Sequence, residues 1–164
     1  MGIGWVDDLT ARLPRHGVAR EWTMMAWWWL SDVAKYLERG SLFEAAERIA
    51  LVRQEALKLY AAARDVPYPL FGLTSLLDYE PFEVPQNLAE TYPVPTDRIS
   101  VAAAARCVAA LLAQCSHSAA THLGYDLSTP WETTARQHLE TAIHSRHGRP
   151  FNRPGAVPGT PDRG

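Results

Sequence analysis

Apolar residues recur at spacings of three and four over 20–39, the period that buries one face of a helix. The face predicted to be buried carries Trp22, Ala26, Trp29, Val33 and Leu37. Gly40 comes next, and glycine is the residue that most often ends a helix in the left-handed conformation. The pattern therefore predicts a helix over 20–39 that ends at Gly40.

A second helix is predicted directly afterwards, over 41–63. Its opening "SLFE" has the form of a capping box, in which the side chains of Ser41 and Glu44 bond the free amides of the first turn. The predicted inner face consists of Leu42, Ala46, Ile49, Ala56 and Tyr60. Because the turn between the two helices is so short, we expect them to pack antiparallel.

The segment 64–96 differs from its surroundings. Its prolines forbid a long helix, and its aromatic residues make a disordered linker improbable, so we expect an ordered excursion. Two more helices are predicted, over 97–123, with Thr96 or Asp97 as cap and Gly124 as stop, and over 130–147. The predicted fold is all-α: an antiparallel four-helix bundle with an irregular Pro/aromatic-rich excursion between the second and third long helices. It forms a single domain over 1–147, followed by a disordered Pro/Gly-rich tail over 148–164.

Charge and composition narrow the class of protein. The formal net charge of −2 lacks the basic excess typical of nucleic-acid-binding proteins. The longest apolar runs, such as "MMAWWWL", are much shorter than the roughly 20 residues of a membrane span, and we expect no secretion signal. Cys107 and Cys115 lie about 12 Å apart on one predicted helix, too far for a disulfide. We expect two reduced thiols and a cytoplasmic protein.

The sequence carries no recognisable catalytic or cofactor motif. Among the six histidines, only His144 and His147 share a helical spacing, and no carboxylate or cysteine completes a ligand set around them. Phosphate-binding loops, dinucleotide turns and nucleophile elbows are also missing from the sequence. We expect no metal and no cofactor, and whether the protein is an enzyme stays open.

Three consecutive tryptophans stand on the first helix, where neighbours differ in direction by about 100°. We expect Trp29 in the core, Trp28 facing Arg53 of the second helix in a cation–π contact, and Trp27 on a surface that binds a partner. A structural arginine that reaches solvent is the alternative for Arg53. The same antiparallel register places Arg48 opposite Asp32 or Val33.

A small-molecule pocket is predicted on this hairpin, because polar groups there lie beside an aromatic wall. The candidate ligand-binding residues are Trp22, Trp28, Trp29, Tyr36 and Arg53. Asp32 and Glu47 are the candidate catalytic residues, as general bases, although i,i+4 support on a solvated face also accounts for Glu47. If Trp28 and Arg53 prove to be core residues, the pocket is expected beneath the aromatic excursion at 68–92.

Residues 20–115 resemble the C-terminal helical domain of bacterial aminoglycoside-type nucleotidyltransferases. The resemblance rests on "LSDVAKYLERGSLFEAAERIALVRQEALKLY", with its Arg-Gly turn, Ala-Ala pair and Arg53, and on "LAETYP" in the excursion. In that family a catalytic N-terminal domain supplies a Gly-Ser turn and an Asp-x-Asp pair for magnesium and nucleotide, and neither is found in this sequence. The resemblance implies a helical bundle with a surface for a small polar acceptor, and nucleotidyl transfer by this chain alone is not expected.

Two functional hypotheses follow. In the first, the chain is a stand-alone helical protein of bacterial specialised metabolism that binds a small polar or aromatic molecule. Whether it also transforms that molecule stays open. In the second, the chain is a non-catalytic interaction subunit that docks a separate nucleotidyltransferase domain or self-associates. We favour the first, with the protein as a homodimer, since a missing domain leaves apolar surface to be covered.

Overall fold

The chain is all-helical wherever the structure, a computed structural model, describes it, that is over residues 16–79, 83–127 and 129–145. The α-helices are α1 (His16–Arg39), α2 (Leu42–Ala62), α3 (Leu73–Leu77), α4 (Arg98–Leu123) and α5 (Thr129–His144). Two 3-10 turns, η2 (Pro69–Phe71) and η3 (Ala89–Thr91), lie in the excursion. No strand occurs in the described part, so the predicted all-α class is confirmed. The predictions for the extreme N-terminus and for the tail fall outside it.

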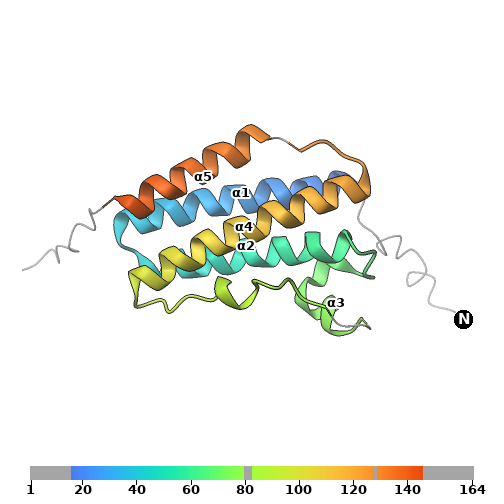
Figure 1. The fold of residues 1–164 in the computed structure, drawn as a ribbon, viewed down its shortest axis with the longest axis horizontal. Helices are drawn as coiled ribbons and strands as arrows, with labels where there is room; N and C mark the ends of the chain where they lie inside the picture. The colour runs from blue at the N-terminus through green and yellow to red at the C-terminus, as the bar shows by residue number, and fades with distance from the viewer. Residues whose placement is uncertain (1–15, 80–82, 128, 146–164) are drawn as a thin grey trace, which may run out of the picture.

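Helix α1 lies between α2 and α5, and α4 packs against both α1 and α2 (Figure 1). The short elements α3, η2 and η3 lie along α2, and η3 also contacts α4. The core is therefore formed where α1, α2 and α4 meet, and α5 closes it on the side of α1. As predicted, the segment between α2 and α4 contains ordered elements that pack on the long helices, in its described parts at 63–79 and 83–97.

The buried face of α1 is rotated from the predicted one. Ala26, Val33 and Leu37 are buried as expected, but Trp27 is only 3% exposed, and Trp22 and Trp29 are half-buried against the core. The remaining buried residues of this face are Ala19, Thr23, Leu30 and Ala34. Trp28 is 57% exposed.

The predicted directions of the three tryptophans are therefore wrong: Trp27 is buried, Trp29 is only half-buried, and Trp28 does not contact Arg53. Trp27 reaches towards α5, where the guanidinium of Arg136 lies 5.8 Å from its ring centre. Trp29 reaches towards α2, where Arg48 lies 4.6 Å from its ring centre. The rings on either side are covered by the two helices that flank α1, and Trp28 between them points away from both.

The turns between helices follow local sequence rules with one exception. Gly40 adopts φ 74° and ends α1, with Ser41 N–H donating to the Tyr36 carbonyl, the Schellman arrangement. Asp97 caps α4 by accepting from the amides of Ile99 and Ser100. The predicted capping box fails, because the Ser41 side chain makes no capping hydrogen bond.

Gly124 ends α4 as predicted, with φ 71° and its amide bonded to the Ala120 carbonyl. On the second helix, Ile49, Ala56 and Tyr60 are buried as expected, whereas Leu42 and Ala46 are only half-buried. Each helix thus keeps its predicted place in the sequence, with ends that shift by a few residues.

Arg98 holds one end of the helices together. Its guanidinium donates to the Leu37 carbonyl at the end of α1 at 2.6 Å. It also donates to the carbonyls of Ala142 and Ser145 at the end of α5, both at 3.2 Å. Carbonyls in the last turn of a helix have no partner within it and carry the negative end of the dipole. A single cation at the start of α4 therefore adds charged hydrogen bonds to the C-termini of two other helices, beside those that Gly40 N–H donates to Leu37 and the Ser145 hydroxyl donates to Ala142.

Among the described helices, α4 alone is long and apolar enough to cross a membrane by length and composition. Half of its most apolar window is buried inside the protein, and the core helix of a soluble protein passes the same test. The burial of Val101, Val108, Leu112 and Cys115 along α4 fits a core helix.

Candidate functional site

The predicted hairpin site is brought together in part, around Arg48. Its guanidinium lies 3.7 Å from the carboxylate of Asp32, as the antiparallel register predicted. The same group lies over the rings of Trp29 and Tyr36, at 4.6 and 6.0 Å. Lys35 adds a second ion pair to Asp32, at 2.9 Å. Two cations therefore already pair with this carboxylate.

The other predicted residues of the hairpin do not join this cluster. Glu47 is exposed. Trp22 is half-buried, with the Lys58 ammonium 5.6 Å from its ring centre and that ammonium paired to Glu55 at 2.7 Å. Trp28 lies on the outer side of α1.

The predicted contact between Arg53 and Trp28 is wrong. The Arg53 guanidinium lies 3.6 Å from the ring centre of Tyr92 and donates to the Thr91 carbonyl at 2.9 Å. Burial lowers the pKa of Arg53, and the neighbouring Tyr92 partly offsets that shift. Arg53 therefore fastens η3 to α2, a role that the register of the hairpin alone could not reveal.

Several hollows lie along the excursion instead. One of them has a volume of about 630 Å³ and lies between the end of α2, residues 83–87 and α4. We call it the polar pocket; its lining consists of Tyr60, Arg64, Glu83, Val84, Pro85, Gln86, Asn87, Leu111 and Gln114. Its size is in the range of ligand pockets, and its polar groups converge from separate segments. It lies beneath residues 83–87 of the excursion. The condition under which a pocket was expected there, Trp28 as a core residue, is not met, because Trp28 is 57% exposed.

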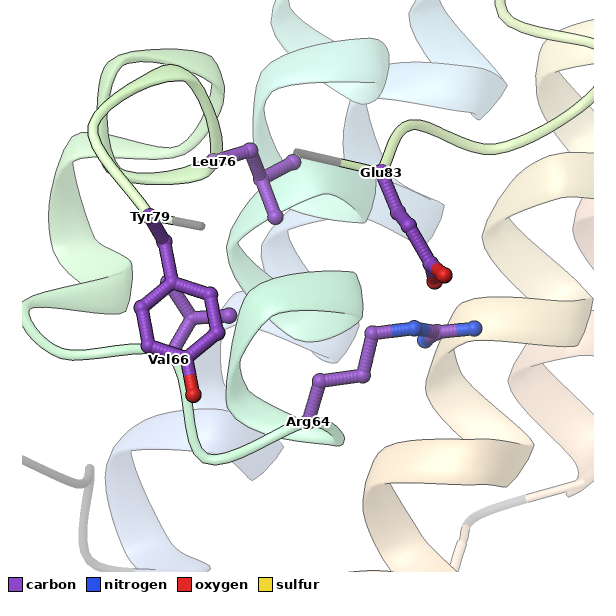
Figure 2. A pocket seen from close by; sticks show the side chains of 5 residues that line it. All are labelled: Arg64, Val66, Leu76, Tyr79 and Glu83. Carbon is purple, nitrogen blue, oxygen red and sulfur yellow. The ribbon is translucent and has the colours of Figure 1, made fainter. Parts of the chain in front are cut away.

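Two side chains of opposite charge face one another at the edge of this pocket. Figure 2 shows the guanidinium of Arg64 and the carboxylate of Glu83 pointing towards each other. Both also border a smaller hollow of about 190 Å³, whose other lining residues are Val66, Leu76 and Tyr79. Within the described ranges, neither charged group forms an ion pair closer than 4.0 Å. The two charges are thus left accessible to a ligand.

The end of α2 positions Arg64. Its chain turns through Asp65, which adopts φ 54°, while Val66 N–H donates to the Ala61 carbonyl in a Schellman arrangement. The αL position is usually glycine, and aspartate tolerates it better than most residues. The Asp65 carboxylate lies 2.7 Å from His122 at the end of α4, which stabilises this turn.

The ring of Tyr60 packs against the guanidinium of Arg64. The guanidinium of Arg64 lies 3.5 Å from the ring centre of Tyr60, and it also donates to the Tyr60 carbonyl at 3.4 Å. Burial raises the pKa of Tyr60; Arg64 opposes that shift, and Glu83 and Cys115 add to it. Tyr60 therefore stays protonated at neutral pH. Stacked in this way, the arginine is preorganised, which lowers the entropy lost when it binds a ligand.

Cys115 lies buried behind this site, and burial raises the pKa of its thiol to about 12. Such a thiol is not a nucleophile at neutral pH. Both cysteines are free, as predicted. No group of three or more His, Cys, Asp or Glu side chains that could hold a metal ion occurs in the described ranges, and the absence of a metal stays a prediction.

Sequence reasoning missed the polar pocket because its residues come from three separate segments. The signals in the sequence were the aromatic content of the excursion and its clustered amides at Gln86 and Asn87. Neither signal indicates which helix these residues contact.

Comparison of the chain with models of protein families, with curated proteins and with solved structures finds no match in any of the three.

Proposed function

We propose that this protein binds a small polar molecule in the polar pocket, within an antiparallel four-helix bundle that works in the cytoplasm. The ligand carries an anionic group for Arg64 and an amino or hydroxyl group for Glu83. Side-chain amides of the pocket add hydrogen bonds along its length. A molecule between the size of an amino acid and a disaccharide fits the volume of about 630 Å³.

The observation that carries this proposal is the guanidinium of Arg64, fixed on the Tyr60 ring at 3.5 Å and facing Glu83. Arginine recognises carboxylates and phosphates through two parallel hydrogen bonds. Glu83 restricts the ligands that the pocket accepts, because its carboxylate repels a molecule that carries only negative charge. Binding is the function supported here; the acids predicted to be catalytic lie on the hairpin, outside this pocket's lining.

A ligand-observed NMR screen tests the proposal. The panel consists of amino acids, amino sugars and small carboxylic acids, each measured with the native protein. We expect at least one compound to bind, and its signal to disappear with Arg64→Ala and with Gln114→Trp, which fills the pocket. The control is Arg106→Ala, an exposed arginine of α4 that lies outside the pocket lining. Binding that survives both pocket variants contradicts the proposal.

The second candidate function is that of an interaction subunit, and the exposed apolar side chains of the excursion favour it. The residues concerned are Leu70, Phe71, Leu77, Tyr79, Tyr92 and Val94, which are between 40% and 64% exposed. A group of exposed apolar side chains is typical of a surface that binds another protein. If the chain docks a separate nucleotidyltransferase domain, as the resemblance implies, Phe71→Glu should weaken that complex in a pull-down and leave ligand binding unchanged.

A further inference from the structure

We propose that the outer face of α1 is a self-association surface, where α1 of one copy packs antiparallel on α1 of a second copy about a twofold axis at Trp28. The face is formed by Glu21, Met24, Met25 and Trp28, which are exposed, and by half-buried Lys35 with its ion-pair partner Asp32. This surface lies apart from the polar pocket, so the proposal does not depend on the ligand.

The face is apolar in its centre and exposed. Trp28 is 57% exposed, and Met24 and Met25 are 44% and 45% exposed. Helix α1 lies between α2 and α5 (Figure 1). Trp27 is turned to α5 and Trp29 to α2, where an arginine lies over each ring. Tryptophan and methionine are enriched in protein interfaces relative to the remaining surface.

The charges at the two ends of the face are complementary to those of a second copy of the same face. Glu21 and Lys35 each lie seven residues, two helical turns, from Trp28 and therefore on the same side of the helix. A twofold axis at Trp28 brings Glu21 of each copy opposite Lys35 of the other, forming two pairs of opposite charge. The Lys35 ammonium is 2.9 Å from Asp32 within its own chain and has further donors to share.

The length of the helix fits the same arrangement. Trp28 lies at the middle of α1, which runs from His16 to Arg39, so antiparallel copies overlap over almost the full helix. Gly17 then faces the end of the other helix, and it has no neighbouring atom within 4 Å of where a Cβ would stand. An interface made by one helix face is smaller than a standard interface, so we expect a dissociation constant on the order of 10 μM.

Analytical ultracentrifugation between about 1 and 300 μM tests the proposal on the native chain. We expect a concentration-dependent shift from the monomer mass of 18.3 kDa towards twice that value. Trp28→Glu should raise the dissociation constant at least about 100-fold, because each copy then brings an unpaired charge into the centre. The control, Ile99→Glu, changes a side chain of α4 that is 80% exposed and should leave the dimer intact.

Charge exchange tests the register. Glu21→Lys and Lys35→Glu should each weaken the dimer by about tenfold, since each places like charges opposite one another twice. The double variant should return to within about threefold of the native constant, and thermal unfolding of all three variants verifies that they fold. A native protein that stays monomeric at 300 μM overturns the proposal, as does a dimer that survives Trp28→Glu. Failure of the double variant to recover overturns the antiparallel register.

Discussion

Arg98→Ala is expected to destabilise the fold more than any other change to a charged side chain discussed above. The guanidinium contacts three carbonyl oxygens, at 2.6, 3.2 and 3.2 Å, that belong to the ends of α1 and α5. The substitution removes all three bonds and takes a positive charge from the negative ends of two helix dipoles.

The geometry sets the magnitude. The bond to Leu37 is short and comes from Nη1, whereas the bonds to Ala142 and Ser145 come from Nη2 and are both long, so we count these two together as about one. Hydrogen bonds that involve a charged group contribute about 1.5–3 kcal/mol each. Water replaces part of this at a half-buried site, so we expect the free energy of unfolding to fall by about 2–4 kcal/mol. For a domain of this size that lowers the melting temperature by about 10 °C.

Urea unfolding monitored by circular dichroism measures the effect, with Arg106→Ala as the matched control. Arg106 also starts on α4 and reaches α5, but it pairs with Glu140 where both side chains are nearly half exposed, at 44% and 48%. Such a surface pair contributes at most about 1 kcal/mol. Arg98→Lys should lie between the two, because lysine cannot reach three carbonyls in a fixed plane. If Arg98→Ala costs no more than Arg106→Ala, the account of this end of the fold is wrong.

Three further predictions concern stability and reactivity. Trp27→Ala should lower the free energy of unfolding by about 3–5 kcal/mol as a buried aromatic truncation, whereas Trp28→Ala should cost under about 0.5 kcal/mol at concentrations where the chain is monomeric; urea unfolding compares them. At pH 8 a thiol reagent should modify half-buried Cys107 readily and Cys115 only after unfolding, because burial raises the pKa of the second thiol to about 12; mass spectrometry counts the modified thiols. A hydrogen bond from Arg106 lowers the pKa of Glu140 below its ordinary 4.5. The small contribution of this pair to the free energy of unfolding is therefore present above pH 4.5 and is lost as the pH falls through the lowered pKa. Unfolding measured between pH 3 and 6 should show this loss for the native protein and not for Glu140→Gln.

The helices were predictable because their signals are local. Glycine in the left-handed conformation at 40 and 124 and an aspartate cap at 97 each depend on a few neighbouring residues. The direction of the tryptophans was not predictable in the same way. A helix with apolar residues on most of its circumference, as at 24–30, has no single apolar stripe, so its orientation depends on which helices flank it.

The candidate site shows the same division between local and distant information. The pairing of Arg48 with Asp32 followed from the register of a tight hairpin. The contacts of Arg53 with Thr91 and Tyr92 depend on where an irregular segment returns to α2, 38 residues along the chain in the case of Thr91. The hydrophobic periodicity of a sequence does not predict where an irregular segment packs back on a helix. The polar pocket could not be predicted for the same reason, because residues 83–87 form one of its walls.

The central claim is that the polar pocket, with Arg64 facing Glu83, holds a small polar ligand. The most direct measurement is a titration of the ¹⁵N-labelled protein with the strongest compound of the screen, with backbone amide shifts followed by NMR. The account predicts that the largest shifts fall on residues 60–64, 83–87 and 111–114, that Arg64→Ala abolishes them, and that Glu83→Gln weakens binding of a ligand with an amino group by at least about tenfold. Shifts that centre on the hairpin around Asp32 and Trp29, or that persist in Arg64→Ala, would contradict it.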